Sequence, residues 1–254
     1  RRTAAAPPRG VRPRGVPEPL VDPLLSVVVP VFNEAATVAE LVRRVRAQPW
    51  RKQVVLVDDG STDGSLAILR RLAADHDDVE VLALSRNQGK GAALRAGFAA
   101  VTGDLVVVQD ADLEYDPADF GELLVPLLDG RADVVFGSRF LGGPHRTLNY
   151  HHYVANRFLT TLSNVCTNLN LTDMETCYKA FRREVLDGMV LREDRFGFEP
   201  EFTARVAAAG HRVYEVPISY SGRDYDEGKK IGWRDGVHAI RVILRSRFEA
   251  SRWG

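Results

Sequence analysis

Short apolar runs alternate with amphipathic stretches along most of the chain. The runs have the length of strands, and the stretches between them repeat apolar residues at helical spacing. The expected strands are 25–31, 53–57, 79–84, 105–108 and 132–136, and the expected helices are 36–47, 65–74, 91–101 and one after Pro117. Strands that are apolar at nearly every position are buried on both faces. The pattern therefore predicts an α/β fold in which helices cover both faces of a mostly parallel sheet.

The alternation is less regular after Gly143. The pattern there predicts a long helix over 150–169, a strand over 178–181, a helix over 201–209 and a strand over 213–216. One face of the long helix carries Val154, Phe158, Leu162, Val165 and Leu169, and we expect Cys166 on this apolar face to lie in the core. We find no internal repeat and no Gly/Ser-rich linker. The second half is therefore expected to complete the same domain.

The two ends of the chain differ from this central domain, which we place at 24–230. Residues 1–23 contain six prolines and five arginines and are expected to form an irregular basic arm. Residues 231–254 are expected to form an amphipathic helix. Its apolar face would carry Trp233, Val237, Ile240, Leu244 and Phe248, beside a stripe formed by Arg234, Arg241, Arg245 and Arg252. Such a helix suits an anionic membrane surface, and a helix packed on the domain with its arginines in water is the alternative.

Composition excludes several classes of protein. The 254 residues hold 34 Lys plus Arg and 34 Asp plus Glu, so bulk positive charge does not favour nucleic-acid binding. Two cysteines are too few for a disulfide scaffold and fit a reducing compartment. Because no apolar run reaches the length of a membrane span, an integral membrane protein is not expected.

Polar residues follow three of the expected strands, at the sheet edge where open α/β folds bind ligands. The sharpest group is Asp110, Asp112 and Glu114, which follows the strand 105–108. Hard carboxylate oxygens at this spacing suit Mg²⁺ or Mn²⁺, and helix capping is the alternative. Asp58 and Asp59 follow the strand 53–57, where a carboxylate can accept from a nucleobase N–H, or where both can simply form a turn.

Two further segments complete this picture. Glu34 follows the first strand and is placed to accept from ribose hydroxyls. The segment 88–91, Gln-Gly-Lys-Gly, matches neither the P-loop nor the dinucleotide fingerprint, so we interpret it as a strand-to-helix turn beside the nucleotide.

These blocks together resemble the family 2 glycosyltransferases, which have the Rossmann-like GT-A fold. The resemblance rests on the segments 26–34, 57–64, 87–97 and 110–117, and it extends more weakly to about residue 235. It is strongest to the dolichyl-phosphate mannose synthase branch, which transfers a sugar from a nucleotide to a polyprenyl phosphate. The Asp-x-Asp-x-Glu block at Asp110, the Gly-Ser-Arg at Arg139, Asp173 and the Glu-Val-Pro-Ile at Glu215 match that branch.

The resemblance implies a metal-dependent enzyme that inverts the sugar C1. A metal, Mg²⁺ or Mn²⁺, would be bound by Asp110, Asp112 and Glu114, and the catalytic residues would be Asp112, Asp173 and Arg139. A UDP- or GDP-sugar would contact Pro30, Phe32, Glu34, Asp58, Asp59, Lys90, Asp110, Ala111, Arg223 and Lys230. The acceptor phosphate would be held by Arg139 and Arg157, each of which has a structural ion pair or a solvated position as its alternative role.

The acceptor class stays open at this stage. A phosphate monoester is already a nucleophilic anion, whereas a saccharide or metabolite hydroxyl needs a base, for which Asp173 and Glu175 are the candidates. A nucleotidyltransferase is disfavoured because no Gly-rich basic loop follows the first strand, and an intact Asp-x-Asp argues against a non-catalytic sensor. We expect a cytoplasmic protein, peripheral at the cytoplasmic face of the membrane, with a separate membrane anchor protein as a further candidate partner.

Overall fold

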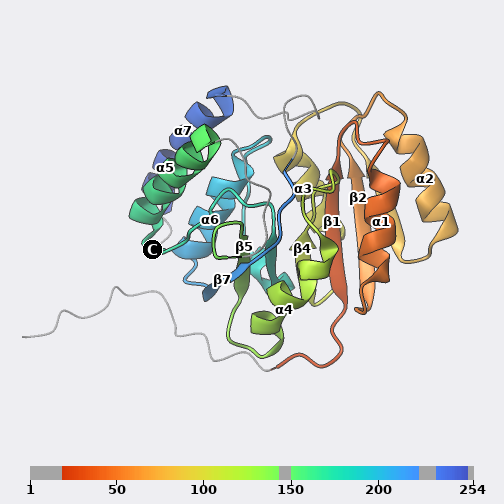
Figure 1. The fold of residues 1–254 in the computed structure, drawn as a ribbon, viewed down its shortest axis with the longest axis horizontal. Coiled ribbons are helices and arrows are strands. Elements are labelled where there is room, and N and C mark those ends of the chain that lie inside the picture. The colour runs from red at the N-terminus through yellow and green to blue at the C-terminus, as the bar shows by residue number, and fades with distance from the viewer. Residues whose placement is uncertain (1–18, 143–149, 223–232, 251–254) are drawn as a thin grey trace, which may run out of the picture.

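A seven-stranded sheet forms the centre of the computed structural model, which describes residues 19–142, 150–222 and 233–250 (Figure 1). The strands lie in the order β3-β2-β1-β4-β6-β5-β7. Their bounds are β1 Leu25–Val31, β2 Lys52–Asp58, β3 Val79–Ala83, β4 Leu105–Val108, β5 Val134–Ser138, β6 Lys179–Arg182 and β7 Val213–Pro217. The helices are α1 Val38–Ala47, α2 Ser65–Asp75, α3 Lys90–Ala100, α4 Phe120–Leu128, α5 Tyr150–Thr167, α6 Phe198–Ala208 and α7 Trp233–Ala250, with short 3₁₀ turns at Pro117–Asp119 and Arg183–Leu186.

The sheet is mostly parallel, as the apolar strands predict. Strand β1 pairs in parallel with both β2 and β4, and β2 pairs in parallel with β3. Strand β6 is the exception, because it runs antiparallel between β4 and β5. The strands predicted at 25–31 and 105–108 have the observed bounds, and the others are shifted by one or two residues at an end.

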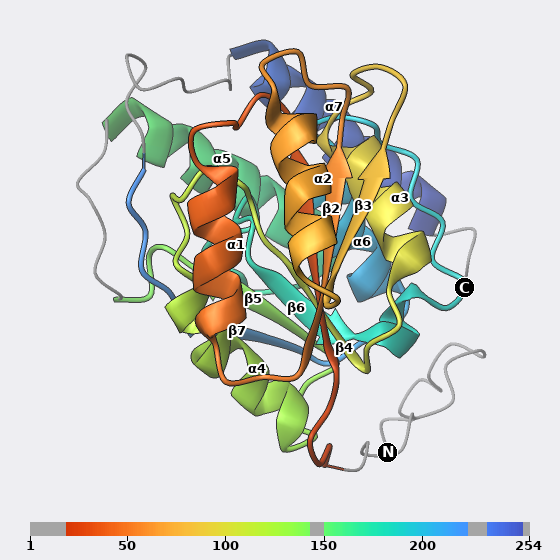
Figure 2. The ribbon, with the colours of Figure 1, turned by 90° about the vertical axis from the view of Figure 1, so that its right-hand side faces the viewer.

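Helices cover both faces of this sheet, which Figure 2 shows edge-on from β3. On one face, Phe98 of α3 and Phe202 of α6 each pack against Phe181 of β6, with ring centroids 5.7 and 5.2 Å apart. On the other face, Phe120 of α4 packs against Tyr178 at 5.9 Å, and α1 contacts α2. The three layers bury β4, β5 and β6 completely and β1 at all but one position, which explains the apolar sequence of these strands, whereas the edge strands β3 and β7 are only partly buried.

Helices α5 and α7 form an outer layer on α6, at the left of Figure 1. The apolar face predicted for α5 turns inward only in part. Leu162 and Cys166 are partly buried against the core, whereas Phe158 is 57% exposed and Val165 is 71% exposed. The inward face also carries polar side chains. Asn164 exchanges two hydrogen bonds with the backbone of Leu171, and the Thr160 hydroxyl accepts from the backbone N–H of Met174 at 3.2 Å. The inner side of α5 carries polar residues because they form hydrogen bonds with the backbone of the segment 171–174.

Cys166 is correspondingly half-buried rather than in the core. Helix α7 packs on the domain through Ala239, Val242 and Ile243, which are buried. Its predicted apolar face points outward, with Val237 at 58% and Leu244 at 42% exposure. The side chains of Trp233 and Phe248 lie outside the described residues. Within the described ranges, none of the helices combines the length and apolarity needed to cross a bilayer.

The orientation of α5 can be tested by comparing Phe158 on this helix with Phe202, a buried reference residue on α6. Phe202→Ala removes a fully buried ring and is expected to lower the free energy of unfolding by about 3–5 kcal/mol. Phe158→Ala removes a mostly exposed ring and is expected to lower it by less than about 0.5 kcal/mol. Urea denaturation of both variants measures the difference, and equal losses would contradict the outward orientation of Phe158.

Candidate functional site

The candidate site lies at the carboxyl ends of β1, β2 and β4, where the polar segments of the sequence meet. These strands are adjacent in the order β2-β1-β4, and the chain leaves β1 toward β2 but returns on its other side as β4. Such a reversal opens a crevice between loops that run in opposite directions. The predicted groups after residues 31, 58 and 108 therefore share one edge of the sheet.

Asp58 is buried at the end of β2, and only one of its two carboxylate oxygens accepts hydrogen bonds from the described residues. Its Oδ2 accepts from the backbone N–H groups of Gly60 and Ser61 at 3.1 and 3.2 Å. Its Oδ1 is buried and has no hydrogen-bond partner among the described residues. A buried carboxylate oxygen without a donor is costly, so this position is suited to an N–H of a ligand.

Asp59 has a different task from its neighbour. Its two oxygens accept from the backbone N–H groups of Gln88 and Gly89 at 2.7 and 2.8 Å. The carboxylate thus fixes the turn into α3, which confirms that 88–91 is a strand-to-helix connection. Gly89 has φ +105°, and a Cβ there would lie 2.4 Å from the carbonyl oxygen of Asp194, so only glycine fits this turn.

The other residues expected to bind the nucleotide-sugar surround this edge. Glu34 is nearly buried, and its Oε2 accepts from the Thr37 hydroxyl at 2.9 Å. Pro30 and Phe32 are half-buried, and Ala111 is buried beside the acidic block. Arg223 and Lys230 lie outside the described residues.

Lys90 is the positive centre of the site. Its Nζ lies 2.9 Å from Asp110 Oδ1 and 3.0 Å from Glu199 Oε1, and its side chain is only 15% exposed. Burial by itself lowers the pKa of Lys90, but the two carboxylates raise it well above its ordinary value. The ammonium therefore stays charged and ties α3 to the end of β4 and the start of α6.

The expected three-carboxylate metal site is not assembled in the described part of the chain, where no group of three such ligands converges. Asp110 faces Lys90, and Glu114 Oε2 accepts from the Tyr220 hydroxyl at 2.6 Å. Asp112 is half-buried, and its Oδ1 accepts from the backbone N–H of Glu114 at 3.1 Å. Mg²⁺ commonly uses only one or two carboxylates together with substrate phosphates and waters, so a metal here does not require all three carboxylates.

Asp173 is locked in a buried ion pair and is not placed to act as a base. Arg139 donates to it twice from the guanidinium, Nε to Oδ2 at 2.7 Å and Nη2 to Oδ1 at 2.8 Å, and Asn156 donates at 3.0 Å. Burial alone raises the pKa of Asp173, but the Arg139 charge and hydrogen bonds hold it below its ordinary value. These contacts also pair the Arg139 guanidinium with Asp173, so its charge is already neutralised within the protein.

Arg157 does not join Arg139. It is exposed on the outer side of α5, whereas its neighbour Asn156 points inward to Asp173. Successive helix residues are rotated by about 100°, so these two cannot face the same way. The pairing of Arg139 with Arg157 at one acceptor phosphate is therefore not formed in this structure.

A second buried charge group consists of Glu175, which the sequence analysis names as a candidate base, and of Glu199 and Lys179, which it missed. Glu175 Oε1 and Glu199 Oε2 are buried without a hydrogen-bond partner among the described residues. Burial and the Glu199 charge raise the pKa of Glu175 to about 8. Lys179 is fully buried, donates to the carbonyl oxygens of Met174 and Thr176, and has its pKa lowered by burial. The available signals were a lysine inside an apolar strand and glutamates between the aromatic residues of 196–202.

A family model described as glycosyl transferase family 2 matches residues 26–189. This range includes the site residues named above except Glu199, Tyr220, Arg223, Lys230 and the Asp194 carbonyl. The chain belongs to glycosyl transferase family 2. A curated relative from Aeromonas hydrophila, undecaprenyl-phosphate 4-deoxy-4-formamido-L-arabinose transferase, is 32% identical over 211 residues. The match covers 81% of this chain and 62% of the relative, so the chain spans about three fifths of the relative's length.

Solved structures share the fold of this family 2 chain. Glucosyl-3-phosphoglycerate synthase from Mycobacterium tuberculosis, in complex with Mn²⁺, UDP and its product, has a TM-score of 0.67 and 22% identity, with 88% of this chain and 80% of that chain covered. The same enzyme with Mg²⁺ and UDP has a TM-score of 0.66 and 22% identity, with 88% and 79% covered. The likeness confirms the expected GT-A arrangement of a mostly parallel sheet between helices.

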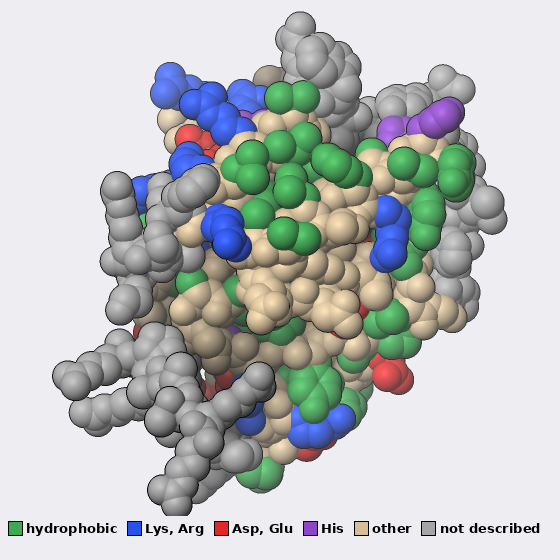
Figure 3. Space-filling view, turned by 90° about the vertical axis from the view of Figure 1, so that its left-hand side faces the viewer, with side chains coloured by type: hydrophobic (Ala, Val, Ile, Leu, Met, Phe, Trp, Pro, Cys, Tyr) green, Lys and Arg blue, Asp and Glu red, His purple; other side chains and the backbone are tan. Residues whose placement is uncertain are grey.

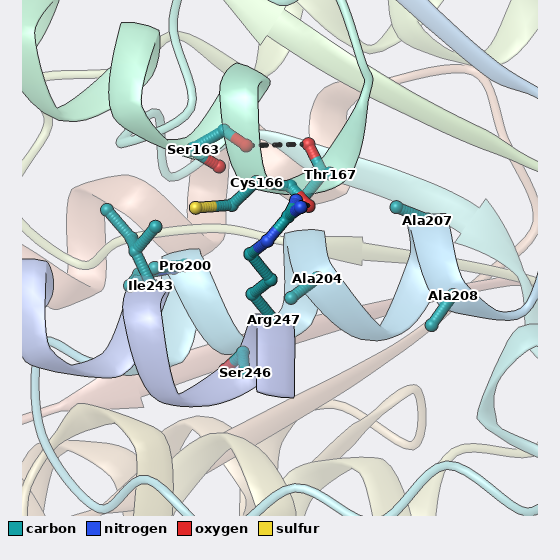
Figure 4. Close-up of a pocket in the computed structure, with 10 residues that line it drawn as sticks. All are labelled: Ser163, Cys166, Thr167, Pro200, Ala204, Ala207, Ala208, Ile243, Ser246 and Arg247. Carbon is teal, nitrogen blue, oxygen red and sulfur yellow. Dashed lines mark hydrogen bonds between the residues drawn. The ribbon is translucent and has the colours of Figure 1, made fainter. Parts of the chain in front are cut away.

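A pocket elsewhere in the family 2 chain is separate from this edge of the sheet. It lies between α5, α6 and α7 and is lined mainly by small residues, with the Arg247 side chain across it (Figure 4). None of the acidic or basic residues described above lines it. We therefore assign it no part in the chemistry of the strand ends.

The Arg139–Asp173 pair is expected to be a structural requirement of this family 2 chain. Arg139→Met leaves a buried carboxylate unpaired and should lower the free energy of unfolding by about 3–5 kcal/mol. Adding Asp173→Asn removes that charge, so the double variant should lose less than the sum of the two single losses. Urea denaturation completes the cycle, with Arg131→Met, which breaks an exposed pair with Asp129, as a control of little effect. Strict additivity would contradict the pairing.

Glu175 is expected to make stability depend on pH. The folded carboxyl keeps its proton up to about pH 8, whereas the unfolded one loses it near its ordinary value of 4.5. The contribution of this carboxyl to the free energy of unfolding is therefore full below pH 4.5 and is lost as the pH rises to about 8. Between pH 5 and pH 8, the free energy of unfolding of Glu175→Gln should rise by on the order of 3 kcal/mol relative to that of wild type. Urea denaturation at both pH values measures this gain. Glu184→Gln, at an exposed position, is the control and should change with pH like wild type. If the stability of Glu175→Gln also changes with pH like that of wild type, the pKa of Glu175 is not raised.

Proposed function

We propose that this chain transfers a sugar from a UDP- or GDP-sugar to a polyprenyl phosphate, with inversion at the sugar C1. The observation that carries the acceptor class is the buried Arg139–Asp173 pair, which removes Asp173 as a base. An acceptor that brings its own negative charge needs no base. The Aeromonas relative supports this choice, since its name describes transfer to undecaprenyl phosphate.

The donor is bound at the strand ends in this proposal. Asp58 Oδ1 accepts from an N–H of the base, and Glu34 accepts from the ribose hydroxyls. The buried, partnerless state of Asp58 Oδ1 supports the first contact. UDP in the solved glucosyl-3-phosphoglycerate synthase is consistent with a nucleoside diphosphate bound in this fold.

Asp112 is the residue proposed to hold Mg²⁺ or Mn²⁺ together with the donor diphosphate. When bound, the metal neutralises the negative charge that develops on the leaving diphosphate. Lys90 orients Asp110, which lies two residues before Asp112, through the 2.9 Å ion pair. Arg223 and Lys230, which lie outside the described residues, are proposed to close over the diphosphate.

The transfer is a single displacement. An oxygen of the acceptor phosphate attacks C1, the bond from C1 to the diphosphate oxygen breaks, and its electron pair leaves with the nucleoside diphosphate. Glu175 holds a proton at neutral pH because its pKa is about 8, so it adds no negative charge to repel the acceptor. Arg139 is proposed to position Tyr220, whose ring lies 5.0 Å from the guanidinium carbon.

We also propose how the chain is divided and where it acts. Residues 24–230 form the catalytic domain, 1–23 a basic arm and 231–254 a helix at the membrane surface. The protein is proposed to be peripheral at the cytoplasmic face, where a lipid acceptor is within reach, with a separate membrane anchor protein as a candidate partner. The outward apolar residues Val237 and Leu244 support the placement of the helix.

A hydroxyl acceptor is the second candidate, and one observation favours it. Glu175 has a pKa near the working pH and a buried oxygen without a partner among the described residues, as suits a general base. In this candidate the ionised fraction of Glu175, which grows as the pH approaches 8, takes the proton of a saccharide or metabolite hydroxyl as the oxygen attacks C1 and the nucleoside diphosphate leaves. The two candidates differ in the product that they form from the same donor.

The test incubates the protein with Mg²⁺ or Mn²⁺, a short polyprenyl phosphate and a panel of UDP- and GDP-sugars, with mass spectrometry of the products. A glycosylated polyprenyl phosphate is expected, and Asp112→Asn should reduce its rate by at least about 100-fold. Asp77→Asn, an exposed carboxylate beyond α2, is the matched control and should keep the wild-type rate. Nucleotide release without a lipid product, together with transfer to a sugar hydroxyl, would replace the proposal by the second candidate.

A further inference from the structure

Exposed apolar side chains gather on the outer surface of α5 and α7. We call this the α5–α7 face; Figure 3 shows hydrophobic side chains collected there, with basic side chains at its edges. Its exposed apolar residues are Tyr150, Tyr153, Val154, Phe158, Val165, Val237 and Leu244. On α5, Val154, Phe158 and Val165 recur at the spacing of one helix face, with the exposed Thr161 between the last two. Monomeric soluble proteins rarely expose such a patch without a use for it.

The two helices form one surface rather than two separate patches. They lie side by side in Figure 1, and both pack on α6. Near their C-terminal ends, Arg247 Nη1 donates to the carbonyl oxygens of Val165 and Cys166 at 3.4 and 3.2 Å. This contact fixes α7 against α5, so their outer residues move as a unit.

The charge around the face is positive. Helix α5 contains no acidic residue, and the acidic residues of α7, Asp235 and Glu249, lie at its two ends. Arg157 and Arg241 are exposed and form no ion pair with the described residues. By contrast, Arg245 is used inside the fold, where it pairs with Glu193 at 2.6 Å. Apolar residues with a basic rim match a bilayer that carries anionic lipids.

The inner side of α5 connects this face to the candidate site. Asn156 donates to Asp173 at 3.0 Å, and Thr160 binds the backbone of Met174 in the same segment. The outer face of α5 is therefore exposed, while its inner face contacts the segment that contains Asp173 and Met174. A lipid-phosphate acceptor lying in a bilayer under the α5–α7 face would have its headgroup one helix diameter, about 10 Å, from this segment.

We propose that the α5–α7 face docks on a bilayer that contains anionic lipid, with α5 as the principal contact and α7 beside it. The proposal rests on the proposed function in one respect, because the polyprenyl phosphate acceptor is what makes this orientation useful. Phe158 and Val165 insert among the acyl chains near the headgroups, and Tyr150 and Tyr153 lie at the interface, which aromatic rings with a polar end favour. Arg157 and Arg241 contact lipid phosphates.

Flotation with lipid vesicles tests the docking without any need for turnover. The full chain is mixed with vesicles of phosphatidylcholine alone or with about 30% phosphatidylglycerol, a fraction chosen to give an anionic surface. We expect binding to the anionic vesicles, and Phe158→Glu with Val165→Glu should weaken it at least about tenfold. Arg241→Glu should weaken it about fivefold and raise its sensitivity to salt.

Matched controls separate the face from general effects of surface charge. Val125 on α4 is 47% exposed and lies away from the face, so Val125→Glu should bind the vesicles like wild type. Arg71 is exposed on α2, so Arg71→Glu is the control for Arg241→Glu. Circular dichroism melting confirms that each variant is folded, as expected for exposed positions.

Three results would overturn the proposal. Wild-type protein that stays with neither type of vesicle has no such docking face. Binding that Phe158→Glu with Val165→Glu leaves unchanged must use another surface. A dimer in light scattering that the same variant dissociates would assign the face to a second copy of the chain instead of to lipid.

A parallel assay keeps this proposal distinct from the proposed function. Turnover of a short, water-soluble polyprenyl phosphate needs no bilayer, and the Phe158 and Val165 variants should retain it. Turnover without vesicle binding would reject only the docking face. Vesicle binding that depends on the face, with no turnover of any polyprenyl phosphate, would reject only the acceptor.

Discussion

The Lys90 ammonium between Asp110 and Glu199 is the interaction on which the arrangement of the site depends. It joins the end of β4, the start of α3 and the first turn of α6, which are distant in sequence. Two carboxylates buried near each other repel, and a third, Glu175, lies close enough to have its pKa raised by Glu199. A fixed cation at the centre offsets the repulsion among these carboxylates. Asp59 supports the same cation indirectly, because it holds the turn from which α3 begins.

A second neutralised pair, Arg139 with Asp173, divides the tasks of the site. With its carboxylate committed to Arg139 and Asn156, Asp173 maintains the shape of the loop before β6 rather than accepting a proton. The carboxyl that keeps a proton is Glu175. In the proposed function, this division suits an acceptor that is already an anion. It also means that the loss of either member of the pair acts first on stability and only then on turnover, so kinetic data on these residues need a folding measurement beside them.

Helix α5 shows how one element serves two surroundings. Its inner side is polar because the loop 168–174 requires donors and acceptors, which Asn156, Thr160 and Asn164 supply. Its outer side carries the exposed apolar residues, while Leu159 and Leu162 are partly buried against the core. The exposed apolar residues therefore lie on the side of α5 opposite the segment that contains Asp173 and Met174. This is the surface that we propose for membrane docking, in a chain whose described ranges contain no helix long and apolar enough to cross a bilayer.

The sequence by itself determined the α/β class, the mostly parallel sheet, the family and the polar strand ends, because these depend on local periodicity and on short motifs. It also placed Asp58, Lys90 and Asp112 at one edge, since the carboxyl ends of parallel strands converge. Only the tertiary structure decided the partners of each charge. Lys90 finds Glu199 about a hundred residues away, and Asp173 finds Arg139 across 34 positions, distances along the chain at which spacing carries no information. The direction of α5 was likewise decided by the loop that it must hold, because an amphipathic pattern shows that a helix has two faces but not which of them is covered.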